Sequence, residues 1–238
     1  MPAISATAPG KVILFGEHAV VYGRPAIAIP VTQVKAKAIV TANPRGAQGE
    51  VRLLATDIGL DAMLEDLEPA QPLAAAILEA ASALKVKRLP ACTIKITSTI
   101  PLAAGMGSGA AVSVAVIRAV SAFLGHPLPD EKVSALAFEV EKIYHGTPSG
   151  IDNTVVTYAR PVYFVKGQPV ETLKVRRPFT LVIGDTGISS PTGAAVGEVC
   201  KAWQAGKTLY EAYFDSIGAM TQSARQAIES GGVELLGP

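Results

Sequence analysis

Residues 101–110 read Pro-Leu-Ala-Ala-Gly-Met-Gly-Ser-Gly-Ala and form a glycine-rich loop between two apolar segments. The segment before the loop, 93–100, is rich in β-branched residues and predicts a strand, whereas 110–124 has the pattern of a buried helix. Glycines let a backbone approach a ligand closely, and the first N–H groups of a helix have no partner within it and attract anions. The loop is therefore predicted to cradle a phosphate group with help from the Ser108 hydroxyl. A tight turn built for packing alone would show the same pattern.

Two familiar nucleotide-binding motifs fit this loop less well. A Walker A loop needs a lysine directly after the glycines, and none is present. A dinucleotide fingerprint, G-x-G-x-x-A, is matched by Gly105, Gly107 and Ala110. That fingerprint also requires a strand ending in an acidic residue about 20 positions further on. Residues 124–129 instead form a Gly/Pro loop before another helix, so the dinucleotide interpretation is disfavoured.

The rest of the chain mixes strand and helix patterns. Further strands are predicted at 11–15, 28–42, 51–55, 154–158, 162–165 and 180–184. Helices are predicted at 73–84, 110–124, 130–145, 192–205 and 209–230. This order indicates an α/β or α+β class. Residues 174–178 end in Arg-Arg-Pro before a new apolar run and predict a boundary between a first domain, 1–178, and a second, 179–238.

Three polar residues flank a very apolar strand near the N-terminus. Lys11 stands at its start, and Glu17 and His18 follow its end. The strand itself, 12–15, has no polar alternation and is predicted to be buried on both faces. Side chains in the loops at its ends can reach a ligand. A solvated lysine and a Glu–His pair in a surface turn remain the alternative.

Two acidic residues flank a turn that contains proline and glycine. Glu141 falls in the last turn of the helix predicted at 130–145, and Asp152 falls at the start of the strand predicted at 154–158. Two carboxylates brought from different elements to an anion site suit phosphoryl transfer, in which one holds a metal ion and the other meets the acceptor hydroxyl. A helix-surface glutamate and a turn-capping aspartate are the ordinary alternative.

Composition and charge narrow the class of partner. The 238 residues are 49% hydrophobic, and Lys plus Arg number 21 against 20 Asp plus Glu, so the basic surface of a nucleic-acid binder is not expected. The first residues show no basic region leading into an apolar one, so a secretory leader is not expected. The most apolar stretch, 110–124, is shorter than the roughly 18 to 20 residues of a membrane helix. Cys92 and Cys200 stand far apart, as free thiols in a reducing compartment do. A cytoplasmic protein with a small-molecule partner, and without nucleic acid or membrane, is predicted.

Two long segments resemble the first two signatures of the GHMP small-molecule kinases. They are P-G-K-V-I-L-F-G-E-H-A-V-V-Y-G at 9–23 and P-L-A-A-G-M-G-S-G-A-A at 101–111. A third segment, H-G-T-P-S-G-I-D-N at 145–153, is similar to the mevalonate kinases within that superfamily. The resemblance implies an N-terminal α/β domain, a C-terminal ferredoxin-like domain, and transfer of a phosphoryl group from ATP to mevalonate with Mg²⁺ as cofactor. It leaves the oligomeric state open, a homodimer included.

The resemblance also implies roles for individual residues. Asp152 matches the catalytic base, Lys11 matches its partner near the reacting hydroxyl, and Glu141 matches a magnesium ligand. The substrate pocket is matched by Glu17, His18, His145 and Thr192. The nucleotide loop is matched by Pro101, Ala104, Gly105, Met106, Gly107, Ser108, Gly109 and Ala110. His145 has the ordering of its turn as an alternative role, and Thr192 has N-capping of the next helix.

The chain departs from the family pattern at two places. Relatives often carry two serines after the glycines, whereas this chain has Ser108 and Gly109, so Ser108 or a water is expected to complete the metal site. Nothing after Gly193 resembles the family's third signature, of G-x-G-G type. The second domain is therefore expected to be incomplete, and a protein ending at Pro238 to be much less active than one extended by roughly 60 to 80 residues. A sister kinase acting on phosphomevalonate or on another mevalonate oxygen, and a catalytically silent ligand sensor, stay open as alternatives.

Overall fold

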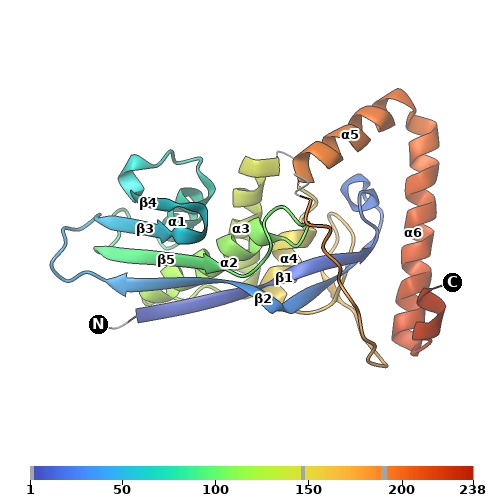
Figure 1. Ribbon diagram of the computed structural model, residues 1–238, viewed down its shortest axis with the longest axis horizontal. Helices are drawn as coiled ribbons and strands as arrows, with labels where there is room; N and C mark the ends of the chain where they lie inside the picture. The colour runs from blue at the N-terminus through green and yellow to red at the C-terminus, as the bar shows by residue number, and fades with distance from the viewer. Residues whose placement is uncertain (1–2, 146–147, 189–191, 238) are drawn as a thin grey trace.

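A computed structural model describes residues 3–145, 148–188 and 192–237, and its frame is a seven-stranded sheet (Figure 1). The strands run in the order β4-β3-β5-β2-β6-β7, and β1 pairs with β2 outside that path. They are β1 (Ala3–Phe15), β2 (Ala26–Ala42), β3 (Val51–Ala55), β4 (Leu60–Met63), β5 (Cys92–Ser98), β6 (Val162–Phe164) and β7 (Glu171–Thr172). The helices are α1 (Pro72–Ala83), α2 (Ser108–Phe123), α3 (Asp130–His145), α4 (Ile151–Tyr158), α5 (Thr192–Ala205) and α6 (Lys207–Ser230). Single 3₁₀ turns are η1 (Ala19–Tyr22), η2 (Thr56–Ile58), η3 (Leu64–Asp66) and η4 (Val233–Leu236). The mixed α/β class predicted from the sequence is confirmed.

Strand β2 organises the sheet because it is long enough to pair with three neighbours. It runs antiparallel to β1, β5 and β6, while β3 and β5 form a parallel pair. The register of β1 against β2 shifts between Pro9 and Gly10, as expected where proline cannot donate to the ladder. Strand β1 also begins well before the predicted position 11, because its first half consists of small alternating residues with a weak strand signature.

The core lies between the sheet and helices α1, α2 and α3. Helix α2 is its centre, with Val114, Ile117 and Val120 fully buried. Near β6, the two faces of the sheet are covered by different helices. Ala26 of β2 belongs to a cluster with α4, whereas its neighbour Ile27 belongs to a cluster with α6. This alternation is what a strand buried on both faces requires.

Two predicted strands are wrong. Residues 154–158 form the body of helix α4, although Val155, Val156 and Thr157 favour strands. Their burial between the sheet and α3 outweighs local propensity, and the Thr154 hydroxyl donates to the Gly150 carbonyl at 2.6 Å within the first turn. The second error is 180–184, which has no strand partner among the described residues. Its Val182 is 93% exposed.

Helices α5 and α6 stand at the β6–β7 end of the sheet and form an angled pair beside the blue segment that carries η1 (Figure 1). Helix α6 is attached through Ala224 and Ile228, which pack on Ile27 and Tyr163 of the sheet. Among the described residues, no helix combines the length and apolarity required to cross a membrane.

Candidate active site

Lys11 and the glycine-rich loop are packed directly against each other. The backbone N–H of Lys11, on β1, donates to the Met106 carbonyl at 3.0 Å. Gly107 has φ +67°, and a Cβ added there would lie 2.8 Å from Lys11 Cγ. A side chain at position 107 would therefore be both strained and displaced by the lysine stem. The first two sequence motifs thus share one site, and Lys11 is 4% exposed within it.

Asp152 forms an ion pair with Lys11. The ammonium nitrogen of Lys11 lies 2.9 Å from Asp152 Oδ1, and the two side chains are 5% and 26% exposed. Asp152 occupies the first turn of α4, after Gly150 at φ +92°, and not the start of a strand as predicted. A helix N-terminus carries partial positive charge, so this position favours a carboxylate. Lysine and helix end therefore hold one carboxylate oxygen in a defined place.

Glu141 lies in the last turn of α3 and is 6% exposed. Burial, and then the neighbouring negative charge of Asp152, raise its pKa to about 8, against an opposing effect of Lys11. The Glu141 carboxyl is therefore held largely protonated at neutral pH in the absence of a cation. A divalent cation would displace that proton, because the carboxylate would then have the counter-charge it lacks.

The glycine-rich loop lines one side of a cavity of about 460 Å³. Gly107 is the N-cap of α2, so the free N–H groups at the start of that helix face this loop. All eight residues predicted for the nucleotide loop line the cavity: Pro101, Ala104, Gly105, Met106, Gly107, Ser108, Gly109 and Ala110. Pro72 and Leu73 of α1 also line it, although no local motif marks them.

A second cavity, of about 440 Å³, lies on the other side of the carboxylates. Glu17 and His18 line it, as predicted for a substrate pocket, together with Lys166 from the segment after β6. Glu141 and Asp152 line both cavities. The two carboxylates therefore stand where a group could pass from a ligand in one cavity to a ligand in the other.

Two predicted site residues have side chains that the structure does not describe, and two residues that line the cavities were not predicted. The side chains of His145 and Thr192 lie outside the described residues, although their backbones end α3 and begin α5. Gly193, next to Thr192, lines both cavities. Lys166 was missed because an isolated lysine after a short strand carries no sequence signal. Only the folding of β6 beside β2 brings it to the cavity.

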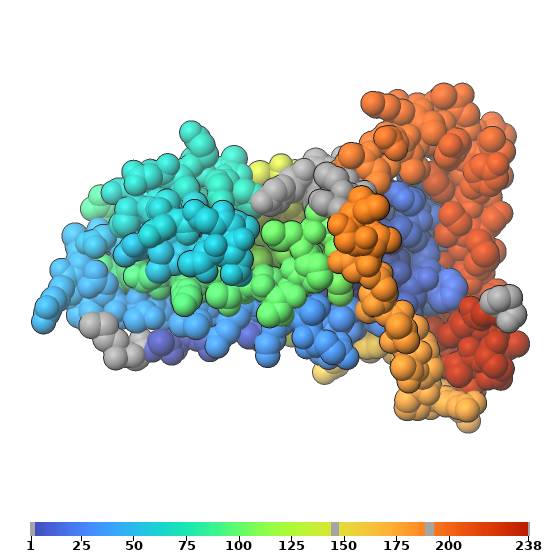
Figure 2. Space-filling view, viewed as in Figure 1, coloured from blue at the N-terminus to red at the C-terminus, as the bar shows by residue number. Residues whose placement is uncertain are grey.

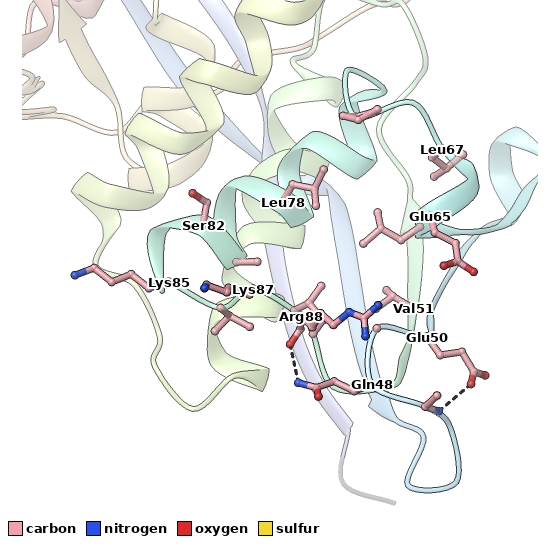
Figure 3. Close-up of a pocket in the computed structure, with 17 residues that line it drawn as sticks. Gln48, Glu50, Val51, Glu65, Leu67, Leu78, Ser82, Lys85, Lys87 and Arg88 are labelled. Carbon is pink, nitrogen blue, oxygen red and sulfur yellow. Dashed lines mark hydrogen bonds between the residues drawn. The ribbon is translucent and has the colours of Figure 1, made fainter.

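A separate hollow opens between α1 and the segment before β3 (Figure 3). Gln48, Glu50, Lys87 and Arg88 line it, and the Gln48 amide donates to the Arg88 carbonyl at 3.4 Å. Its lining mixes both charge signs and includes neither Lys11, Glu141 nor Asp152. It offers polar surface residues that can be changed without touching the two cavities.

The described residues contain no cluster of three or more histidine, cysteine or acidic side chains that could by itself hold a metal. Mg²⁺ in phosphoryl-transfer sites usually needs fewer, since one or two carboxylates, water and substrate phosphates complete its shell. Glu141 and Ser108, which both line the cavity under the glycine-rich loop, supply a donor set of that kind. The residues present therefore fit Mg²⁺ bound together with a polyphosphate.

Comparison with known proteins gives a consistent set of relatives. A family model described as the GHMP kinases N terminal domain matches residues 73–160. The mevalonate kinase of Thermococcus sibiricus is 35% identical over 241 residues, which cover 94% of this chain and 70% of that protein. The mevalonate kinase of Pyrococcus furiosus is 34% identical over 243 residues, covering 95% and 70%.

Solved structures agree with these relatives. The L. major mevalonate kinase in complex with R-mevalonate has a TM-score of 0.74 at 30% identity, covering 98% of this chain and 71% of that chain. The Lin0012 protein from Listeria innocua has a TM-score of 0.83 at 21% identity and covers 99% of this chain and 75% of that chain, which shows a shared fold. Part of each relative's length, about three tenths in the curated ones, has no counterpart in this chain.

Proposed function

This chain belongs to the GHMP kinases, within the mevalonate kinase family, and we propose from that premise that its two cavities bring ATP and mevalonate together for phosphoryl transfer. The observation that carries the proposal is the Lys11–Asp152 ion pair, 2.9 Å long, beside Glu141 at the boundary of both cavities. The intact set of three charged residues argues against a silent ligand sensor.

The cavity under the glycine-rich loop would take the triphosphate of ATP. Free N–H groups at the start of α2 can bind phosphate oxygens, and Gly107 lets the backbone approach them closely. Glu141 would hold Mg²⁺, with Ser108 as a second candidate ligand. When bound, the ion neutralises charge on the phosphates. Every residue named here lines that cavity.

The cavity with Glu17 and His18 would take mevalonate. Lys166 supplies a cation there, which suits the carboxylate of this substrate and has no comparable use with an uncharged sugar. Asp152 would orient the acceptor hydroxyl and take its proton, while Lys11 fixes the carboxylate and stabilises negative charge on the transferring group. We propose His145 and Thr192 as further substrate contacts, on the basis of the family resemblance alone.

Two broader assignments accompany this proposal. We assign the reaction to the cytoplasm, where ATP is available and the free thiols of Cys92 and Cys200 stay reduced. We also propose the division at 178/179, because α6 packs on the sheet through a separate small cluster that includes Ile228.

A coupled ATPase assay with mevalonate, phosphomevalonate, homoserine and galactose tests the proposed function. We expect turnover with mevalonate alone, and a monophosphate product by mass spectrometry. Lys87→Ala, in the hollow of Figure 3, is the surface control and should retain the wild-type rate. Turnover of phosphomevalonate in preference to mevalonate would support the sister-kinase alternative instead.

A further inference from the structure

A group of contacts joins the segment after β1 to helix α6, and we call it the clasp. Its polar half is Arg24, whose guanidinium binds two carboxylates of α6. Arg24 Nη2 lies 2.5 Å from Glu211 Oε2 and 2.8 Å from Asp215 Oδ1. Arg24 Nε donates to the same Asp215 oxygen at 3.0 Å. Nη1 of Arg24 donates to the Tyr22 carbonyl at 2.9 Å, so the guanidinium also orders its own segment.

The apolar half of the clasp is an aromatic stack. The ring of Tyr22 lies on the ring of Phe214 of α6, with centroids 4.2 Å apart and an interplanar angle of 14°. Trp203 of α5 packs against Tyr22 at 5.1 Å, and its Nε1–H donates to Glu211 Oε1 at 2.9 Å. The clasp therefore ties together the η1 segment, α5 and α6.

Helix α6 is shaped to allow this approach. Gly218 is buried in the middle of α6, where glycine costs about 1 kcal/mol of helix stability relative to alanine. A Cβ at Gly218 would lie 3.2 Å from Arg24 Cγ and 3.4 Å from Pro25 Cδ. The helix thus has a notch where Arg24 and Pro25 cross it. Figure 2 shows the blue surface of this part of the chain lying against α6.

The clasp borders the cavity lined by Glu17 and His18, here called the alcohol-binding cavity. It does not border the cavity under the glycine-rich loop, here called the nucleotide cavity. The η1 segment lines the alcohol-binding cavity through Tyr22, and α5 lines it through Val196, Gly197 and Cys200. The Tyr22 ring packs on Trp203 of α5 at 5.1 Å, so the η1 segment and α5 are in contact beside this cavity. The nucleotide cavity receives only Gly193 from α5.

We propose that the clasp is a positioning device that holds α5 against the η1 segment. It thereby determines the affinity of the protein for the alcohol substrate and has little effect on the affinity for ATP. The identity of that alcohol rests on the proposed function. Arg24 and Phe214 line neither cavity, and they act through their contacts with the lining residue Tyr22 and with α5. They are positioning residues.

The first test is a split between the two Michaelis constants. Arg24→Ala should raise KM for mevalonate by about tenfold and leave KM for ATP within about twofold, because only the alcohol-binding cavity loses its wall. Arg24→Lys keeps the charge without the planar fork and should recover part of the loss. Gly218→Val, which fills the notch and removes no charge, should act in the same direction as Arg24→Ala.

The matched control is Arg225→Ala. Arg225 also joins α6 to the body, through Glu171 of β7 at 2.6 Å, and its exposure of 28% is close to the 22% of Arg24. It lines neither cavity. Arg225→Ala should therefore leave both Michaelis constants unchanged. An equal rise in KM for mevalonate in both arginine variants would overturn the proposal in favour of general loosening of α6.

Two readouts do not depend on turnover. Trp203 is the single tryptophan of the chain, so its emission should shift to the red when the clasp opens in Arg24→Ala. Alkylation of Cys200 should become faster in the same variant, because α5, which carries Cys200, is then no longer held against Tyr22. Emission and alkylation identical to wild type in both Arg24→Ala and Gly218→Val would overturn the clasp. So would an opened clasp with an unchanged KM for the alcohol.

The two proposals fail separately. Wild-type protein that phosphorylates another alcohol contradicts the proposed substrate, and the clasp is then judged on KM for that alcohol. Wild-type protein with no kinase activity contradicts the proposed function. The clasp is then judged by the effect of mevalonate on the alkylation rate of Cys200, which should be protected in wild type and much less protected in Arg24→Ala.

Discussion

The ammonium of Lys11 lies 2.9 Å from the Asp152 carboxylate, although one residue belongs to strand β1 and the other to the first turn of α4. A lysine that is 4% exposed needs such a partner, because an unpaired charge is costly in the protein interior. Asp152 lines both cavities, so we expect stability and catalysis to depend on the same contact.

Asp152→Asn should fold, bind both substrates and lose turnover by about 10²- to 10⁴-fold, as expected for a lost general base. Because it leaves Lys11 without its counter-charge, it should also lower the melting temperature. Steady-state kinetics and thermal melts measure both effects. Asp61→Asn, which breaks an exposed ion pair with Arg52, is the control and should change neither. Turnover within threefold of wild type would remove Asp152 from the role of base.

Glu141→Gln should distinguish the residue that binds the metal ion from the residue that acts as the base. Glu141 is the buried carboxylate that we assign to Mg²⁺, so its amide variant should raise the Mg²⁺ concentration for half-maximal rate far more than Asp152→Asn does. The titration is run at saturating ATP with both variants. Equal metal requirements in the wild type and Glu141→Gln would show that the ion is held elsewhere.

Without metal, Glu141 should make stability depend on pH. Its pKa is raised from the usual 4.5 to about 8 in the folded protein, so between these values the folded state keeps a proton that the unfolded state has lost. The stabilisation is complete below pH 4.5 and is lost as the pH rises through about 8. We expect the melting temperature of the wild type to fall relative to that of Glu141→Gln across this window.

The comparison isolates one group because all other titrating residues are common to both proteins. Addition of Mg²⁺ with a non-hydrolysable ATP analogue should remove most of the difference at pH 8, since the charged carboxylate then has a partner. Parallel melting curves for wild type and Glu141→Gln from pH 5 to 8 would contradict the raised pKa.

The sequence predicted which residues belong to the candidate site better than it predicted the secondary structure that positions them. The glycine-rich loop and the segment around Lys11 were predicted because their function requires particular residue types in a short stretch. Asp152 was correctly singled out but assigned to the start of a strand, because Val155 and Val156 favour strands wherever local composition alone is considered. Long-range packing against α3 and the sheet decides in favour of the helix.

Residues that reach the site from distant elements carried no such signal. Lys166 and Leu73 line the two cavities because β6 pairs with β2 and α1 packs on α2, and neither residue belongs to a recognisable motif. Tyr22 lies within a recognised segment, yet its contact with Phe214 depends on where α6 docks. Such contacts follow from topology, which a single sequence specifies only weakly.

The last prediction compares two glycines of the same loop. Gly105 and Gly107 both have positive φ, at +71° and +67°, so alanine is strained by about 1 to 2 kcal/mol at either position. Only at Gly107 would the new Cβ also collide, lying 2.8 Å from Lys11 Cγ, whereas nothing lies within 4 Å at Gly105. Gly107→Ala should therefore displace Lys11 and lose at least tenfold more kcat than Gly105→Ala, while the two variants melt at similar temperatures. A comparable loss of kcat in both variants would mean that backbone strain in the loop, and not its contact with Lys11, limits the reaction.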